Sequence, residues 1–292
     1  MTDDALDASD VSVTNVATAL FSRLHISDDG NDAAVEEYIR GCKPANASTP
    51  IILCDAFYGF PSQKRPRNEK VRAVSRQLVN FLQWRSEASE KITNCHIHVL
   101  GEGKDVEAVK SRVNELKSQT NASISKCEIN FQQDIDIHKF LDQQHYTTSS
   151  LSEVVYLSPD ATYSLPTISR PPRVVIVGML IDRRITEGRS RRRAEDLLNI
   201  RAAKLPLDEL SVKELSSSEP LNVDTVMELM QRWWNNCDKL EQRIHDKVIE
   251  NDDSNTEALS QLYKRCFLEA AAWSMKSQRD RHPNRTLHKT DY

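Results

Sequence analysis

The fold is decided by residues 174–184, which read VVIVGMLIDRR. From Val174 to Ile181 the run is apolar and is interrupted only by Gly178. Such a run is typical of a strand buried on both faces of a parallel sheet. Asp182 follows it directly, at the strand end where open α/β sheets bind their ligands, and Gly178 allows a flat group to approach the backbone closely. The segment therefore predicts an α/β domain with a ligand site at this edge.

Further short apolar runs alternate with helical patterns along the chain. The expected strands are residues 50–57, 95–100, 127–131, 154–157, 174–181 and 203–206. The expected helices are residues 34–39, 71–82, 106–116, 135–141, 190–200, 223–248 and 259–273, the second of them after a loop with Pro61 and Pro66. This order predicts a mainly parallel sheet flanked by helices, with Ser190 as the cap of helix 190–200.

Charge is distributed unevenly along the 292 residues, whose net charge is −4. Residues 1–50 hold nine acidic and three basic side chains, and we expect residues 1–30 to be a largely disordered acidic lead. Residues 170–204 hold ten basic and four acidic side chains. This local positive field suits a phosphate-bearing partner, and a solvated arginine face is the open alternative.

Several classes of protein have no support in the sequence. No apolar run approaches the length of a membrane span, and the six cysteines form no Cys-x-x-Cys pair. P-loop, Gly-x-Ser-x-Gly and His-Glu-x-x-His motifs are absent. The start of the chain shows neither a signal peptide nor an organellar presequence, which favours an intracellular protein of nucleus or cytoplasm.

Two weaker motifs lie around the strand at residues 95–100. Gly101-Glu102-Gly103 resembles the turn of a Rossmann nucleotide-binding unit but lacks its third glycine, so a simple tight turn is favoured. His96 and His98 share one face of the strand, without a third ligand at metal-binding spacing. We therefore expect no metal site, and we keep a Rossmann methyltransferase or dehydrogenase as the alternative enzyme class.

Ordered blocks of the sequence resemble the tRNA position-9 N1-purine methyltransferase family of the SPOUT class. The blocks are residues 51–55, 76–78, 155–160, 173–183, Ala194, 204–208 and 221–226. The resemblance covers about residues 31–248, which leaves 249–292 as a helical and basic tail. Residues 187–190 and 205–209 look most like the mitochondrial branch, whose vertebrate member is the methyltransferase subunit of protein-only ribonuclease P.

This resemblance implies a trefoil-knotted α/β domain that binds S-adenosylmethionine in the knot. The cofactor pocket would be lined, largely through backbone groups, by Leu157, Gly178, Ser190, Leu205, Leu221, Asn222 and Val223. Asp182 matches the family's proposed general base, which would remove the proton from N1 of guanine. Adenine N1 carries no such proton, so an enzyme of this branch could act on either purine.

The implied substrate is tRNA. Its phosphates would be bound by Lys64, Arg65, Arg67, Arg183, Arg184, Arg189, Arg191, Arg192 and Arg193. Because the acidic first 50 residues repel phosphate, we expect help from protein partners, which the branch resemblance implies are a dehydrogenase-like and a nuclease subunit in mitochondria. Leu259, Leu262, Phe267 and Trp273 of the last helix have no obvious surface to cover, which indicates a protein contact. A catalytically silent tRNA-binding scaffold is the open alternative.

Overall fold

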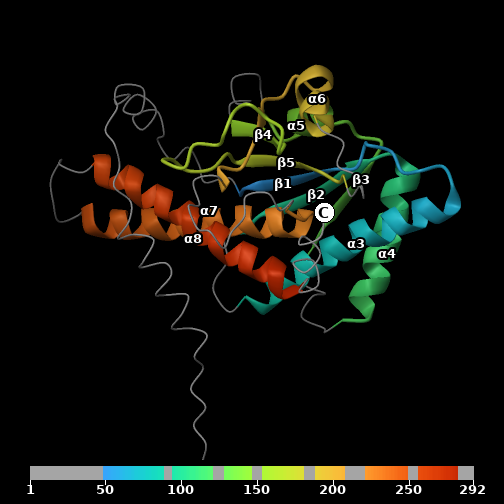
Figure 1. Ribbon diagram of the computed structural model, residues 1–292, viewed down its shortest axis with the longest axis horizontal. Coiled ribbons are helices and arrows are strands. Elements are labelled where there is room, and N and C mark those ends of the chain that lie inside the picture. The colour runs from blue at the N-terminus through green and yellow to red at the C-terminus, as the bar shows by residue number, and fades with distance from the viewer. Residues whose placement is uncertain are drawn as a thin grey trace, which may run out of the picture. The chain divides into compact units, whose positions relative to one another are not determined.

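Six parallel strands form one sheet in the computed structural model, which describes residues 49–88, 94–120, 128–146, 153–180, 188–207, 221–248 and 256–281 (Figure 1). The strands are β1 (Ile51–Asp55), β2 (His96–Gly101), β3 (Asn130–Gln133), β4 (Val154–Leu157), β5 (Val174–Gly178) and β6 (Ala202–Ala203). Their order across the sheet is β3-β2-β1-β5-β4-β6, and every pair is parallel. The expected parallel α/β sheet is therefore confirmed.

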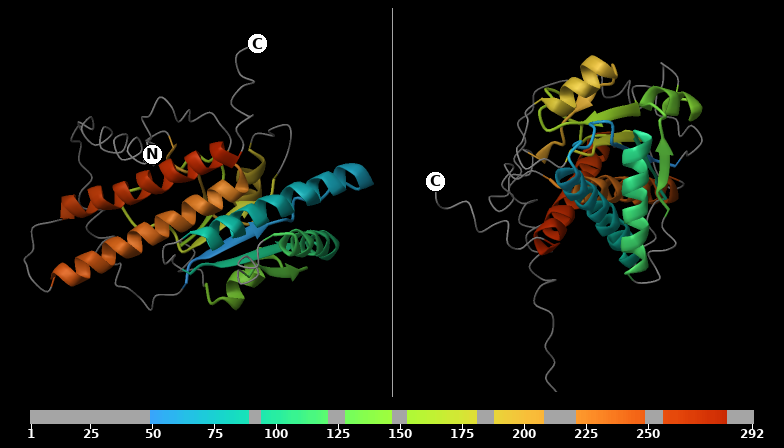
Figure 2. Two further views of the ribbon diagram at one scale, coloured as in Figure 1. Left: turned by 90° about the horizontal axis from the view of Figure 1, so that it is seen from below. Right: turned by 90° about the vertical axis from the view of Figure 1, so that its right-hand side faces the viewer.

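Helices cover both faces of this sheet. They are α3 (Lys64–Glu87), α4 (Gly103–Ser118), α5 (Ile137–Gln143), α6 (Arg189–Arg192), the π-helix η3 (Arg193–Leu197), α7 (Val223–Val248) and α8 (Thr256–Arg281). Figures 1 and 2 show α3, α4 and α7 on one side of the sheet and α5 and α6 on the other. None of the helices in the described ranges combines the length and apolar character needed to cross a membrane.

The central strands are apolar on both faces because each face meets a helical layer. Every residue of β1 is buried, and its register places Leu53 beside Ile176 of β5. Leu53 and Ile176 belong to a core cluster with Phe140 of α5 and Leu198 after η3. Since successive strand residues point to opposite faces, the intervening residues face α3 and α7. The apolar run that begins at Val174 is therefore a buried strand, as predicted, but the strand ends at Gly178 and not at Ile181 as expected.

The first long helix starts earlier than its sequence pattern indicated. Residues 64–70 were expected in a loop because of Pro66, but α3 already begins at Lys64. Pro66 lies in the first turn of α3, where a helix has no intrahelical partner for the amide that proline lacks. The helical register of α3 therefore extends over Lys64, Arg65 and Arg67.

The arginine-rich segment also departs from expectation. Gly188, with a φ of 68°, precedes α6, so Ser190 is a buried residue inside the helix and not its cap. After one turn the helix widens into η3, and it ends before Ile200. The last strand is Ala202–Ala203, slightly earlier than expected, and Lys204 adds a single bridge to Ser164.

The C-terminal helix packs against its predecessor. Phe267 of α8 is fully buried, and its ring lies 4.8 Å from that of Trp233 on α7 in an edge-to-face contact. Ala271 is fully buried and Met275 nearly so. The prediction that this helix lacked a surface to cover was therefore wrong. Leu262 and Trp273 remain 38% and 43% exposed.

Candidate functional site

Three of the predicted pocket residues lie together at one edge of the sheet. Leu157 ends β4, Gly178 ends β5, and Leu205 follows β6 by two residues. β4 lies between β5 and β6, and Leu157 pairs in register with Val177 and Ala203. Because the strands are parallel, their carboxyl ends meet at the same edge, where open α/β sheets bind ligands.

The beginning of α7 lies at this edge as well. The indole of Trp234 donates a 3.1 Å hydrogen bond to the carbonyl of Pro172, just before β5. From Val223 to Trp234 the helix rises about 16 Å, close to the length of β5, and it runs in the opposite direction to that strand. This places Leu221, Asn222 and Val223 near the carboxyl end of β5, with Val223 buried and the other two half-buried.

Ser190 joins the site from the opposite layer. Its hydroxyl lies 2.8 Å from the hydroxyl of Ser158, the residue that follows β4. The carboxylate of Asp160 accepts a 2.7 Å hydrogen bond from the amide of Gly188, which fixes the start of α6. α6 is therefore tied to the loop after β4 at two points.

The edge offers apolar side chains and main-chain groups to a ligand. Gly178, Leu205 and Leu221 are half-buried and carry no charge, so this edge meets a ligand with apolar side chains and main-chain groups. The amides of Asn222 and Val223 already donate to Gln278 and Gln77. A ligand at α7 would therefore meet carbonyls and side chains and not these two amides.

A buried polar network lies beside Gly178 and was not predicted from the sequence. Asp55, fully buried at the end of β1, accepts hydrogen bonds from the hydroxyl of Tyr156 (2.9 Å) and the amide of Phe57 (3.0 Å). The guanidinium of Arg193 binds both carboxylate oxygens. Since the one proton of Tyr156 is directed to Asp55, the hydroxyl of Tyr58 donates to Tyr156, at 2.5 Å.

The two tyrosines explain why position 178 is occupied by glycine. A Cβ atom at position 178 would lie 3.0 Å from the hydroxyl oxygens of both Tyr58 and Tyr156, which is tighter than ordinary van der Waals contact. The flat group that Gly178 admits is therefore Tyr58 itself. Burial raises the pKa of Tyr58 to about 12 and that of Tyr156 well above its usual range. Both phenols stay protonated at neutral pH and supply hydrogen bonds, not a general base.

Several arginines predicted to bind RNA have partners within the protein. Arg193 binds Asp55, and Arg189 donates a 3.2 Å hydrogen bond to the carbonyl of Tyr58 while stacking on its ring. Arg191 lies 3.8 Å from Glu195. Arg67 forms a 2.7 Å ion pair with buried Asp105. Arg193 and Arg189 thus fix the end of β1 and the loop after it, and Arg67 fixes the start of α4.

Other predicted residues are exposed or lie elsewhere. Lys64, Arg65 and Arg192 are exposed. Asp182, Arg183 and Arg184 lie outside the described residues.

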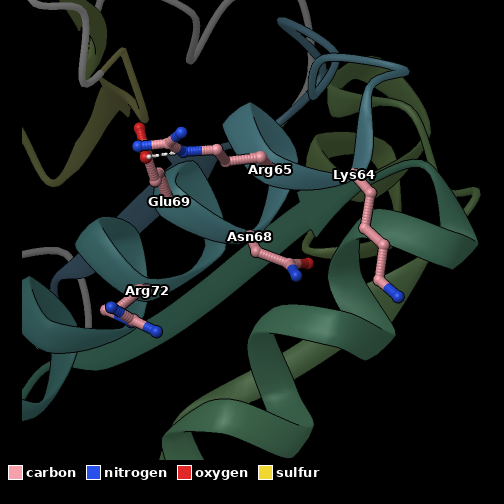
Figure 3. A pocket seen from close by; sticks show the side chains of 5 residues that line it. All are labelled: Lys64, Arg65, Asn68, Glu69 and Arg72. Atoms are coloured by element: carbon pink, nitrogen blue, oxygen red, sulfur yellow. Dashed lines mark hydrogen bonds and ion pairs between the residues drawn. The ribbon is translucent and has the colours of Figure 1, made fainter.

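The start of α3 forms a basic hollow of about 450 Å³ (Figure 3). Lys64, Asn68 and Arg72, spaced four residues apart on the helix, line it together with Arg65 and Glu69. Arg65 is 3.4 Å from Glu69 and its side chain is 92% exposed. Arg72 was not predicted, because it lies two helical turns after Lys64 and residues 64–70 were expected in a loop.

The glycines of the Rossmann-like turn have packing roles. A Cβ atom at Gly101 would approach Ala56 to 3.0 Å, and one at Gly103 would approach the carboxylate of Asp134 to 2.7 Å. The amide of Gly103 donates to Asp134 at 2.9 Å. His98 is buried against Phe140, and burial lowers its pKa to about 4. Within the described residues, no group of three or more His, Cys, Asp or Glu could hold a metal ion.

Comparisons with known proteins identify the family. The chain is similar to spTrm10 crystallised at full length with SAH (16% identity, TM-score 0.44, covering 76% of this chain and 96% of that one). It is also similar to a dual specific Trm10 from Thermococcus kodakaraensis (13% identity, TM-score 0.42, covering 68% and 98%). No curated protein sequence matches it.

A sequence model of the tRNA (guanine(9)-N(1))-methyltransferase TRM10/TRM10A family matches residues 85–245, more than half of the chain. The chain therefore belongs to this family and is a tRNA (guanine(9)-N(1))-methyltransferase.

Proposed function

We propose that the methyl donor binds at the carboxyl edge of β4, β5 and β6, in a trefoil knot lined by Leu157, Gly178, Ser190, Leu205 and residues 221–223. The observation that carries this proposal is the convergence of distant segments: Leu157, Gly178 and Leu205 follow neighbouring strands, and α7 starts beside them. The position of β5 between β1 and β4, although β4 precedes it in the chain, fits a threaded connection.

S-adenosylmethionine supplies the methyl group, and Asp182 supplies the base. The bound donor would supply the methyl group for N1 of guanine, and the carboxylate of Asp182 would accept the N1 proton as the methyl group is transferred. Asp182 comes four residues after Gly178, at the end of the apolar run. The protein holds the splayed-out base and the donor together, and this proximity lowers the barrier further. Adenine, which needs no base at N1, is the second purine substrate in this proposal.

Within the family, we assign the chain to the mitochondrial ribonuclease P branch. In this proposal residues 1–30 form an acidic lead, 31–248 the SPOUT methyltransferase domain and 249–292 the C-terminal tail. Protein partners of the dehydrogenase and nuclease type supply the affinity for tRNA that the acidic lead cannot provide. The proposed compartment of the protein is the mitochondrion. Support comes from residues 187–190 and 205–209, and from the exposed Leu262 and Trp273 on α8.

Replacing a pocket residue tests the proposed cofactor position. Leu205→Arg should abolish S-adenosylmethionine binding in calorimetry, because the half-buried side chain would place a charge and a longer chain in the pocket. Lys104→Glu, an exposed change at the Rossmann-like turn, should leave binding within twofold of wild type. The opposite pattern, or cross-linking of the cofactor to residues 101–104, would move the site to that turn.

The basic hollow on α3 should contribute to tRNA binding. Replacing Lys64, Arg65 and Arg72 by Ala should weaken binding of all tRNAs about equally and reduce the slope of log affinity against log salt by about 2 to 3. A triple Ala variant of Lys264, Arg265 and Lys276 on α8 removes the same charge and serves as control. If both variants show the wild-type slope, the hollow does not contact phosphate.

A further inference from the structure

The first turn of α7 is capped by side chains of two other helices. The amide of Asn222 donates a 2.9 Å hydrogen bond to the side-chain oxygen of Gln278, on α8. The amide of Val223 donates a 2.8 Å hydrogen bond to the side-chain oxygen of Gln77, on α3. The first amides of a helix have no partner within it, so these two glutamines satisfy donors that would otherwise be orphaned. The position of Asn222 and Val223 therefore depends on α3 and α8.

A buried ionic cluster fixes the end of α8 against the same turn. Arg281 donates to the carboxylate of Glu228 at 2.9 Å and to the hydroxyl of Thr225 at 3.3 Å. Asp224, 3.7 Å from Arg281, accepts a further hydrogen bond from Asn80 of α3 at 3.2 Å. Asp224, Thr225 and Glu228 are fully buried. Such a network in a low-dielectric setting holds its members in one arrangement.

Gln278 comes from outside both the stretch that matches the family model and the blocks that resemble the family, whereas Gln77 lies in the block 76–78. The stretch that matches the family model is residues 85–245, so Gln77 precedes it and Gln278 follows it. Gln278 is only 8% exposed, so its amide is held in place by packing. The C-terminal helix thus reaches the candidate cofactor site through one buried side chain.

We propose that Gln77 and Gln278 are positioning residues for the methyl donor, and that α8 is part of the cofactor-binding apparatus. This inference rests on the proposed function, which places residues 221–223 in the cofactor pocket. By holding the amides of Asn222 and Val223, the two glutamines fix the carbonyls and side chains of residues 221–223 before the ligand arrives. A pocket organised in advance spares the ligand the entropy of ordering it.

Replacing each glutamine by methionine keeps the length of the side chain and removes the acceptor. Gln278→Met should raise the Kd for S-adenosylmethionine about tenfold, as expected for one lost hydrogen bond to a buried donor. Gln77→Met should have a similar effect from the other helix. In the protein without cofactor, amide hydrogen exchange should accelerate at Asn222 in the first variant and at Val223 in the second.

Met275→Ala is the matched control on α8. Met275 is 6% exposed and lies one turn before Gln278, so its loss should lower the melting temperature through a cavity. It should leave the Kd within twofold of wild type. A Kd that rises in the glutamine variants but not in Met275→Ala would support positioning, because a merely structural role would move the Kd in parallel with stability.

Faster exchange at both amides with an unchanged Kd would overturn the inference, and Leu205→Arg separates this result from a failure of the proposed function. If Leu205→Arg still abolishes binding, the pocket is correctly placed and only the positioning role is lost. If Leu205→Arg binds as wild type does, the pocket lies elsewhere and both proposals are wrong.

Discussion

Asp182→Asn should lower the rate of guanine N1 methylation by about 100-fold or more, the range that general-base catalysis contributes. The asparagine side chain has nearly the same shape but cannot accept the N1 proton as the methyl group arrives. Methylation of adenine at the same position should fall far less, since adenine N1 has a free lone pair. The ratio of the two rates, measured on tRNAs that differ only at position 9, is therefore the diagnostic quantity.

Binding measurements separate this chemical role from damage to the fold. The Kd for S-adenosylmethionine and the melting temperature of Asp182→Asn should stay close to wild type. Asp196→Asn, a change of an exposed aspartate in η3, should leave both rates unchanged. Full guanine activity in Asp182→Asn would remove this carboxylate from the mechanism.

Arg193→Met should lower the free energy of unfolding by about 3 kcal/mol, because it leaves the buried carboxylate of Asp55 without its cationic partner. Asp55 is fully buried and Arg193 is 16% exposed, so water replaces little of the lost interaction. The hydrogen bonds from Tyr156 and Phe57 remain, which keeps the expected loss at the lower end of the range for such pairs. Chemical denaturation measures this change in the free energy of unfolding.

The adjacent arginine provides the control for this prediction. Arg192→Met removes the same charge from an exposed position and should cost less than about 0.5 kcal/mol. The double variant Asp55→Asn with Arg193→Met should be more stable than the sum of the two single changes implies, since neither charge is then left alone. Equal stability of the two arginine variants would show that the ion pair does not hold η3 to β1.

The strands could be predicted because their cause is local. The run at 174–178 is apolar on both faces, and its composition alone identifies a buried parallel strand. The strand order could not be predicted in this way, because the insertion of β5 between β1 and β4 depends on contacts between distant segments. The start of α3 was missed since proline usually marks a loop, although a first turn tolerates it.

The arginine-rich segment illustrates a limit of charge counting. Its residues share one composition, but Arg193 and Arg189 face Asp55 and Tyr58, which lie more than 130 positions away in the sequence. Nothing near Arg193 in the chain distinguishes it from exposed Arg192. Asp55, by contrast, ends an apolar strand, and Asp182 was singled out because it follows an apolar run, so the same sequence argument could have found Asp55.

The most direct test of the account is to map methylation on tRNA. The purified chain, alone and supplemented with cell extract, is incubated with labelled S-adenosylmethionine and tRNA transcripts that carry guanine, adenine or cytosine at position 9. Nuclease digestion and mass spectrometry then locate each methyl group. The account predicts N1-methylguanosine at position 9 of the guanine transcript and no label in the cytosine transcript. Tight tRNA binding without methylation under either condition would contradict it and would favour the alternative that the chain is a catalytically silent tRNA-binding scaffold.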